Sequence, residues 1–154
     1  MEQNYALVRT FLENPSASAE TFWESQVLVW VDWREEDEYI VKYFNACLPE
    51  KDKIGYECVD CDKPRGIDIL LKGKGVDKAI PYASERLDRN TTINAIQEFL
   101  APDYQIRLYI ESLGGDTLAF CLLSVGEWTR LEDEYSTRTV ARYFEPVRPE
   151  CSLF

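Results

Sequence analysis

The sequence contains no histidine. It therefore lacks the side chain that most often serves as a general acid or base near neutral pH, and that commonly binds metals. Basic residues are also few, because 17 lysines and arginines face 28 aspartates and glutamates and the formal net charge is −11. Such a surplus attracts basic partners and disfavours binding to nucleic acid or to an anionic membrane. These shortages favour a binding protein over an enzyme.

Long apolar runs are absent as well. No stretch approaches the run of about 18 uninterrupted apolar residues that predicts a transmembrane helix. The first residues, Met1 to Asn4, lack the basic and apolar regions of a secretory signal. The five cysteines are odd in number and irregularly spaced, which fits free thiols in a reducing compartment better than a disulfide framework. We therefore expect a cytoplasmic protein.

The sequence does contain enough apolar material for one core. It has 154 residues, of which 45% are hydrophobic, and chains of this length usually form one domain. Apolar residues recur with helical and strand periods in separate segments. We expect residues 1–154 to form a single α+β domain in which helices pack on a five- or six-stranded, mostly antiparallel sheet, with a tail at 145–154. The periods predict helices at 5–12, 19–24, 35–48, 90–100, 125–135 and 137–144, and strands at 26–33, 55–60, 66–72, 77–82, 104–110 and 117–123.

One strand and one connection between strands carry particular expectations. Residues Gln26 to Trp33 are apolar almost without interruption, which is typical of a central strand that is buried on both faces. The pair Gly114 and Gly115 lies between two later strands, and two adjacent glycines suit a tight hairpin.

Two acidic runs are the candidate binding residues. Glu35 to Glu38 begins a predicted helix, where the helix dipole favours negative charge, whereas Glu132 to Glu134 lies near a helix C-terminus, where the dipole disfavours it. Either run could be an ordinary solvated surface, or it could bind a basic partner. If the two ends of the chain meet, the runs form one acidic face. The predicted partner-binding residues are Asp32, Trp33, Glu35, Glu36, Asp37, Glu38, Tyr39, Glu132, Asp133 and Glu134.

The sequence offers little evidence for a catalytic or metal-binding motif. Cys58 and Cys61 form a CxxC, but a zinc site needs four ligands and a redox CxxC needs a helix start that lowers the thiol pKa. Here a turn follows, and Asp60 and Asp62 would raise that pKa. We expect no catalytic residue, no metal and no cofactor. An enzyme based on the carboxylates or the thiols remains the alternative.

Residues in the last third of the chain resemble a known class. The segments 103–109, 114–120, 127–128 and 143–146 are similar to small bacterial immunity proteins of contact-dependent inhibition and related polymorphic toxin systems. The resemblance implies a small, acidic cytoplasmic protein that neutralises a cognate basic toxin, commonly a nuclease, by covering its active site. It implies a protein partner, with no nucleic acid and no membrane. An acidic adaptor that binds a different protein is the other binding alternative.

Overall fold

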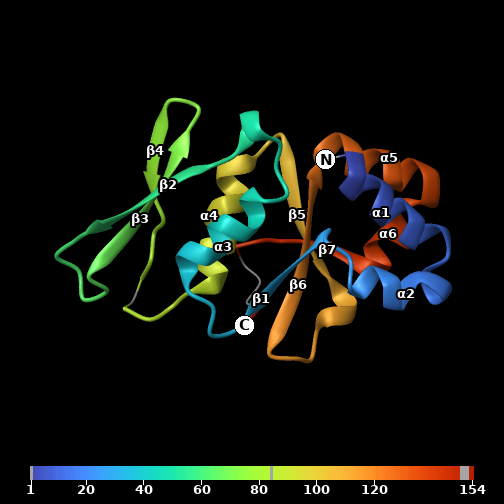
Figure 1. Cartoon of the computed structure of the whole chain (residues 1–154), viewed down its shortest axis with the longest axis horizontal. Helices are drawn as coiled ribbons and strands as arrows, with labels where there is room; N and C mark the ends of the chain where they lie inside the picture. Colours follow the sequence, from blue (N-terminus) through green and yellow to red (C-terminus); the bar gives the residue numbers. More distant parts are fainter. Residues whose placement is uncertain (1, 84, 150–152) are drawn as a thin grey trace.

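The computed structural model describes residues 2–83, 85–149 and 153–154. Their helices and strands are stacked in four layers: helices, a sheet, helices and a second sheet (Figure 1). The first sheet has four strands, all antiparallel, in the order β1-β6-β5-β7. Its strands are β1 (Leu28–Asp32), β5 (Tyr104–Tyr109), β6 (Thr117–Ser124) and β7 (Phe144–Pro146).

The strand β6 is the centre of this sheet. Its residues from Leu118 to Leu123 are all buried, because helices cover both faces. Phe120 lies opposite Val29 on β1 and Leu108 on β5, and all three belong to one apolar cluster.

Four helices cover one face of the first sheet: α1 (Glu2–Glu13), α2 (Pro15–Trp23), α5 (Val125–Tyr135) and α6 (Thr137–Tyr143). The α1 helix buries Val8, Phe11 and Leu12, whose spacing places them on one side of a helix. The α2 helix starts where the Asn14 side chain accepts a hydrogen bond from the Ala17 N–H at 3.3 Å.

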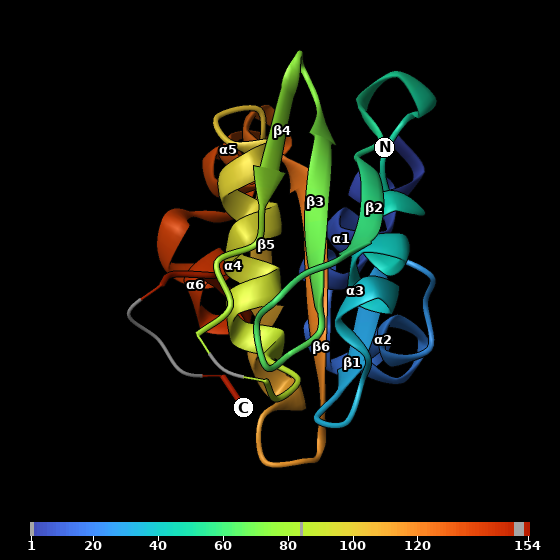
Figure 2. The same ribbon diagram turned by 90° about the vertical axis from the view of Figure 1, so that its left-hand side faces the viewer.

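The other face is covered by α3 (Asp37–Asn45) and α4 (Arg89–Leu100), and a second sheet packs on these helices (Figure 2). Ile69 and Leu71 of this second sheet are buried against that helical layer. Its antiparallel order is β2-β3-β4. The strands are β2 (Gly55–Asp60), β3 (Ile67–Gly73) and β4 (Val76–Ala79), and the short 3-10 helices are η1 (Glu50–Asp52) and η2 (Ile110–Ser112). None of the described helices is both long enough and apolar enough to cross a bilayer.

The α+β class is confirmed, but the prediction of a single sheet is wrong. Residues 55–79 pair only among themselves, and the remaining strands form the other sheet. The α3 and α4 helices lie between the two sheets (Figure 1). Alternation along a strand reports which side is buried, and it carries no information about the sheet to which the strand belongs.

The segment predicted as a central strand is an edge strand. In the described chain β1 pairs with β6 alone. Its apolar character comes from helices on both faces: Val29 and Val31 pack toward α3, and Leu28 packs toward α1 and α2. An edge strand covered on both faces has the same composition as a central strand.

The loop between β5 and β6 and the predicted C-terminal tail also differ from expectation. A tight hairpin is predicted at Gly114 and Gly115, but η2 and a further loop join β5 to β6. The expected tail begins inside β7, and Val147 is buried beside it, with its N–H donating to the Ile106 carbonyl at 3.1 Å. A strand of three residues is too short to show a period. Within the predicted tail, residues 150–152 lie outside the described residues.

Replacing Phe11 should show how strongly the first helical layer depends on aromatic packing. The ring stacks on Phe22, with 4.3 Å between centroids, and meets Tyr109 edge to face. Phe11→Ala should lower the free energy of unfolding by about 3–5 kcal/mol through lost burial and a cavity, as measured by urea denaturation. Thr10→Ala, an exposed change on the same helix, should stay within about 0.5 kcal/mol. Equal effects would contradict this packing.

Candidate protein-binding surface

A group of exposed or half-buried acidic and aromatic side chains lies where β1 ends and α3 begins. We call Trp33, Glu35, Glu36, Glu38 and Tyr39 the acidic–aromatic surface. Trp33 is 46% exposed and Tyr39 is 42% exposed. Both side chains therefore leave a large apolar area in contact with solvent. Large exposed aromatics are typical of protein-binding sites.

Asp32 lies at the edge of this surface and is held by its own turn. Its carboxylate accepts hydrogen bonds from the Arg34 N–H at 2.8 Å and from the Thr117 hydroxyl at 3.3 Å. The Arg34 backbone bond is the main reason that the pKa of Asp32 is lowered. The Arg34 guanidinium is 3.7 Å from the same carboxylate and 5.3 Å from the centre of the Trp33 ring.

The carboxylates of the acidic–aromatic surface are among the acidic side chains that form no ion pair within the described part of the chain. Lysines and arginines form ion pairs with acids on other elements, among them Lys72 with Glu57 at 2.7 Å and Lys78 with Glu98 at 2.8 Å. Among the described residues, no ion pair involves Glu35, Glu36 or Glu38. Glu38 accepts a hydrogen bond from the Cys58 thiol and Glu35 one from the Tyr43 hydroxyl, but no cation among the described residues forms an ion pair with the three carboxylates of this surface.

Asp37, the fourth member of the first acidic run, is not on this surface. It is 2% exposed and pairs with the Arg65 guanidinium. It also accepts hydrogen bonds from the Thr92 hydroxyl at 2.7 Å and from the Asp88 N–H at 3.1 Å. Arg65 in turn lies 3.6 Å from the centre of the Tyr82 ring. Asp37 therefore fastens α3 to α4 and to the turn before β3, and it is not exposed to a partner.

The second acidic run serves largely to attach α5. Glu132 is 3.5 Å from the guanidinium of Arg107, which lies over Trp128, and Glu134 is 2.9 Å from that of Arg9 on α1. Of the three acidic residues in this run, Asp133 alone is exposed and forms no ion pair with a described residue. These bonds offset the unfavourable position near the helix C-terminus. Because α5 and α3 pack on opposite faces of the first sheet, the two runs do not form one surface.

The CxxC lies at the end of β2 and in the turn that follows it. The Cys58 sulfur is 3.2 Å from a carboxylate oxygen of Glu38. Desolvation, followed by the hydrogen bond and charge of Glu38, raises the pKa of the Cys58 thiol to about 11. This thiol is therefore protonated near neutral pH and is a poor nucleophile. Within the described ranges no group of three or more cysteine and acidic side chains is arranged to hold a metal ion.

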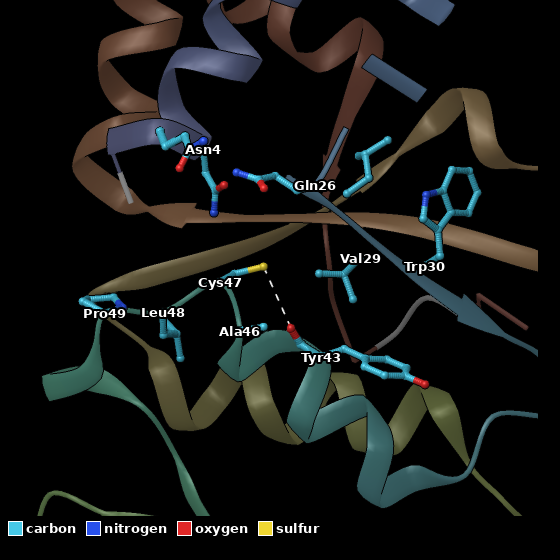
Figure 3. A pocket seen from close by; sticks show the side chains of 11 residues that line it. Asn4, Gln26, Val29, Trp30, Tyr43, Ala46, Cys47, Leu48 and Pro49 are labelled. Carbon is cyan, nitrogen blue, oxygen red and sulfur yellow. Dashed lines mark hydrogen bonds between the residues drawn. The ribbon is translucent and has the colours of Figure 1, made fainter. Parts of the chain in front are cut away.

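Sequence reasoning gave no sign of a groove that runs along the open edge of β1. Its volume is about 550 Å³, and it lies between the N-terminal end of α1 and the C-terminal end of α3 (Figure 3). Asn4, Trp30, Tyr43 and Cys47 are among its lining residues. Three segments that are separated in the sequence form it, and none of them alone carries a pattern that indicates a groove. The open edge could have been recognised only from the strand order.

Comparison with known proteins gives no relative: no protein-family model, curated protein or solved structure matches the chain. The residues that resemble immunity proteins lie mainly in β5, β6 and the core. Trp128 is buried, donates from its indole N–H to the Gln105 carbonyl at 2.9 Å and contacts Phe144. These residues support the fold and do not form the acidic–aromatic surface.

Removing the Asp37 charge should destabilise the protein strongly. Asp37→Asn leaves the buried Arg65 guanidinium without its anion, so the free energy of unfolding should fall by about 3–5 kcal/mol in urea denaturation. The neighbouring Glu36→Gln is the control, because Glu36 is exposed and has no ion pair among the described residues, and it should change stability by less than about 0.5 kcal/mol. Similar stabilities for the two variants would contradict a structural role for Asp37.

The Cys58 thiol should react slowly with iodoacetamide near neutral pH. Since only the thiolate reacts, the rate at Cys58, followed by mass spectrometry, should rise with pH toward the thiol pKa of about 11. Glu38→Gln removes a charge that raises this pKa and should speed alkylation near neutral pH, whereas Glu36→Gln should not. A rate that levels off below about pH 9, as for an ordinary thiol, would contradict the coupling.

Proposed function

We propose that this chain is a non-catalytic, cytoplasmic binding protein that neutralises a basic protein toxin by covering its active site. The observation that carries the proposal is the acidic–aromatic surface: Trp33 and Tyr39 are exposed beside carboxylates that have no internal ion pair among the described residues. The class of partner, a toxin and commonly a nuclease, comes from the resemblance to immunity proteins.

The composition of this surface matches what a tight inhibitor needs. Uncompensated carboxylates speed the encounter with a basic partner and penalise an acidic one. Exposed aromatic rings provide the apolar contacts that dominate the binding free energy when they are buried at an interface. An enzyme active site that binds nucleic acid is positively charged, so an acidic cover is complementary to it.

The enzyme alternatives have less support at the predicted residues. The Cys58 thiol is held protonated, and Asp37 already has its hydrogen bonds filled within the protein. Catalysis by two carboxylates requires them to occupy different environments, whereas the remaining acids of this run are at least partly exposed on one short stretch.

A pull-down from native cells tests the proposal directly: the tagged chain is bound to resin, and the proteins that it retains are identified. A one-to-one complex with the C-terminal domain of a large secreted protein, encoded next to this chain, is the expected result. Within the isolated complex, this chain should block the activity of that domain. A stoichiometric complex with a protein that has no toxic activity would support the adaptor alternative and contradict an immunity role.

Charge reversal on the acidic–aromatic surface should weaken this complex. The triple variant Glu35→Lys, Glu36→Lys and Glu38→Lys should raise the dissociation constant by about tenfold or more, mainly through a slower association rate. The effect should shrink at high salt, which screens exposed charges. Surface plasmon resonance at two salt concentrations measures both.

The matched control changes the net charge by the same amount elsewhere. Glu111, Asp133 and Glu145 are exposed acids outside the acidic–aromatic surface, and their reversal to lysine should leave the affinity nearly unchanged. Circular dichroism should show that both triple variants remain folded. Equal losses in the two variants would mean that net charge alone, and not this surface, attracts the partner.

A further inference from the structure

The open edge of β1 exposes unused backbone hydrogen-bonding groups at Trp30, whereas the Leu28 N–H donates to the Ser25 carbonyl and the Asp32 carbonyl accepts from the Glu35 N–H. The Trp33 N–H donates to the Asp116 carbonyl at 2.9 Å, and the two residues lie opposite each other. Because bonded and non-bonded pairs alternate in an antiparallel ladder, Val29 and Val31 bond to β6, and Trp30 points its N–H and C=O away from the sheet. No described residue forms a hydrogen bond with these two groups of Trp30.

The groove along this edge is uncharged. Its walls bring the amide side chains of Asn4 and Gln26 to one end and the Tyr43 ring to the other (Figure 3), and Gln3 also lines it. None of its lining residues carries a charge, although 45 of the 154 residues of the chain are charged (28 acidic and 17 basic). An uncharged groove beside unpaired backbone groups suits an extended peptide, which needs hydrogen bonds along one side and apolar contacts from alternate side chains.

Acidic side chains lie beyond both ends of the groove. Gln3 and Gln26 also line an adjoining hollow that contains Glu20 and Glu24. At the other end, burial and then the neighbouring charge of Glu35 raise the pKa of Tyr43. The groove is therefore neutral in the middle and negative at both ends.

We infer that the β1 edge binds an extended segment of the basic partner as a fifth strand of the first sheet. The segment is uncharged over the length of β1 and carries lysine or arginine at both ends, where it meets Glu24 and Glu35. This inference rests on the proposed function and adds a second contact to it, because Glu35 belongs to the acidic–aromatic surface. A continuous interface would then run from α3 along the edge of the sheet.

A second copy of this chain is a poorer occupant of the same edge. Antiparallel pairing of two β1 strands would bring the acidic end of one groove toward the acidic end of the other. Two chains of net charge −11 would also repel each other. A partner with basic ends gains attraction at the same positions.

The test uses the full chain and a display library of random peptides of about nine residues, long enough to span β1 at roughly 3.3 Å per residue. We expect selection to enrich peptides with an uncharged middle and basic residues at both ends. The best peptide is synthesised, and its affinity is measured by calorimetry. Methylation of its alternate backbone nitrogens on the side that faces β1 should weaken binding by about tenfold, and methylation on the other side should not.

Two matched substitutions locate the site. Ala46 is exposed and lines the groove, whereas Ala141 is exposed on α6, on the other side of the first sheet. Ala46→Arg fills the groove and should weaken peptide binding by about tenfold or more. Ala141→Arg adds the same side chain and charge and should have no effect. Light scattering on the unmodified chain checks for self-association.

The inference is overturned if no peptide is enriched, if Ala46→Arg binds the peptide as well as Ala141→Arg, or if the chain is a dimer that Ala46→Arg dissociates. The proposed function can fail separately. If the isolated toxin complex is weakened by the charge reversal and unaffected by Ala46→Arg, the function stands and only the fifth strand is wrong. If peptides bind but no toxin complex is found, the function is wrong.

Discussion

The buried pair of Asp37 and Arg65 holds the start of α3, the helix that carries part of the acidic–aromatic surface and whose far end lines the β1 groove. Asp37 is the first residue of α3, and its bonds reach α4 and the turn that precedes β3. These bonds hold the start of α3 against α4 and that turn, and breaking such a buried pair is strongly destabilising. Of the neighbouring carboxylates, Glu36 is exposed and Glu35 and Glu38 are half-buried, and the far end of α3 forms a wall of the β1 groove. Asp37 is therefore the structural carboxylate of the first acidic run, and Glu35, Glu36 and Glu38 remain at least partly accessible to a partner.

Charge in this protein is divided between internal bonding and uncompensated surface. On α5, Glu132 and Glu134 hold Arg107 and Arg9, and they stabilise the packing of helices on the first sheet. At the start of α3, Glu35, Glu36 and Glu38 form no ion pair with a described residue. Two acidic runs that look alike therefore have different physical roles. The difference depends on whether an arginine from a distant element reaches them.

The sequence was sufficient for the type of most elements, because helical and strand periods report local burial. The residues 55–60, which match β2, followed from such patterns, and the Asp32–Tyr39 region is a candidate surface because of its run of acidic residues beside aromatic ones. The edge position of β1 did not, since helices on both faces give it the composition of a central strand. Nor could the sequence distinguish Asp37 from Glu36 and Glu38, because the partners of Asp37 come from residues 65, 88 and 92. Interactions between distant segments determine these features.

The most direct measurement is hydrogen–deuterium exchange of the chain alone and in its complex with the captured partner. We predict that binding slows exchange in two places, the stretch from Leu28 to Tyr39 and the end of α3 from Tyr43 to Leu48, and leaves α5, α6 and the second sheet unchanged. In particular, the Trp30 N–H, which has no backbone acceptor among the described residues, should become protected. Protection confined to α5 or to the second sheet, with Trp33 to Tyr39 unaffected, would contradict the assignment of the binding surface.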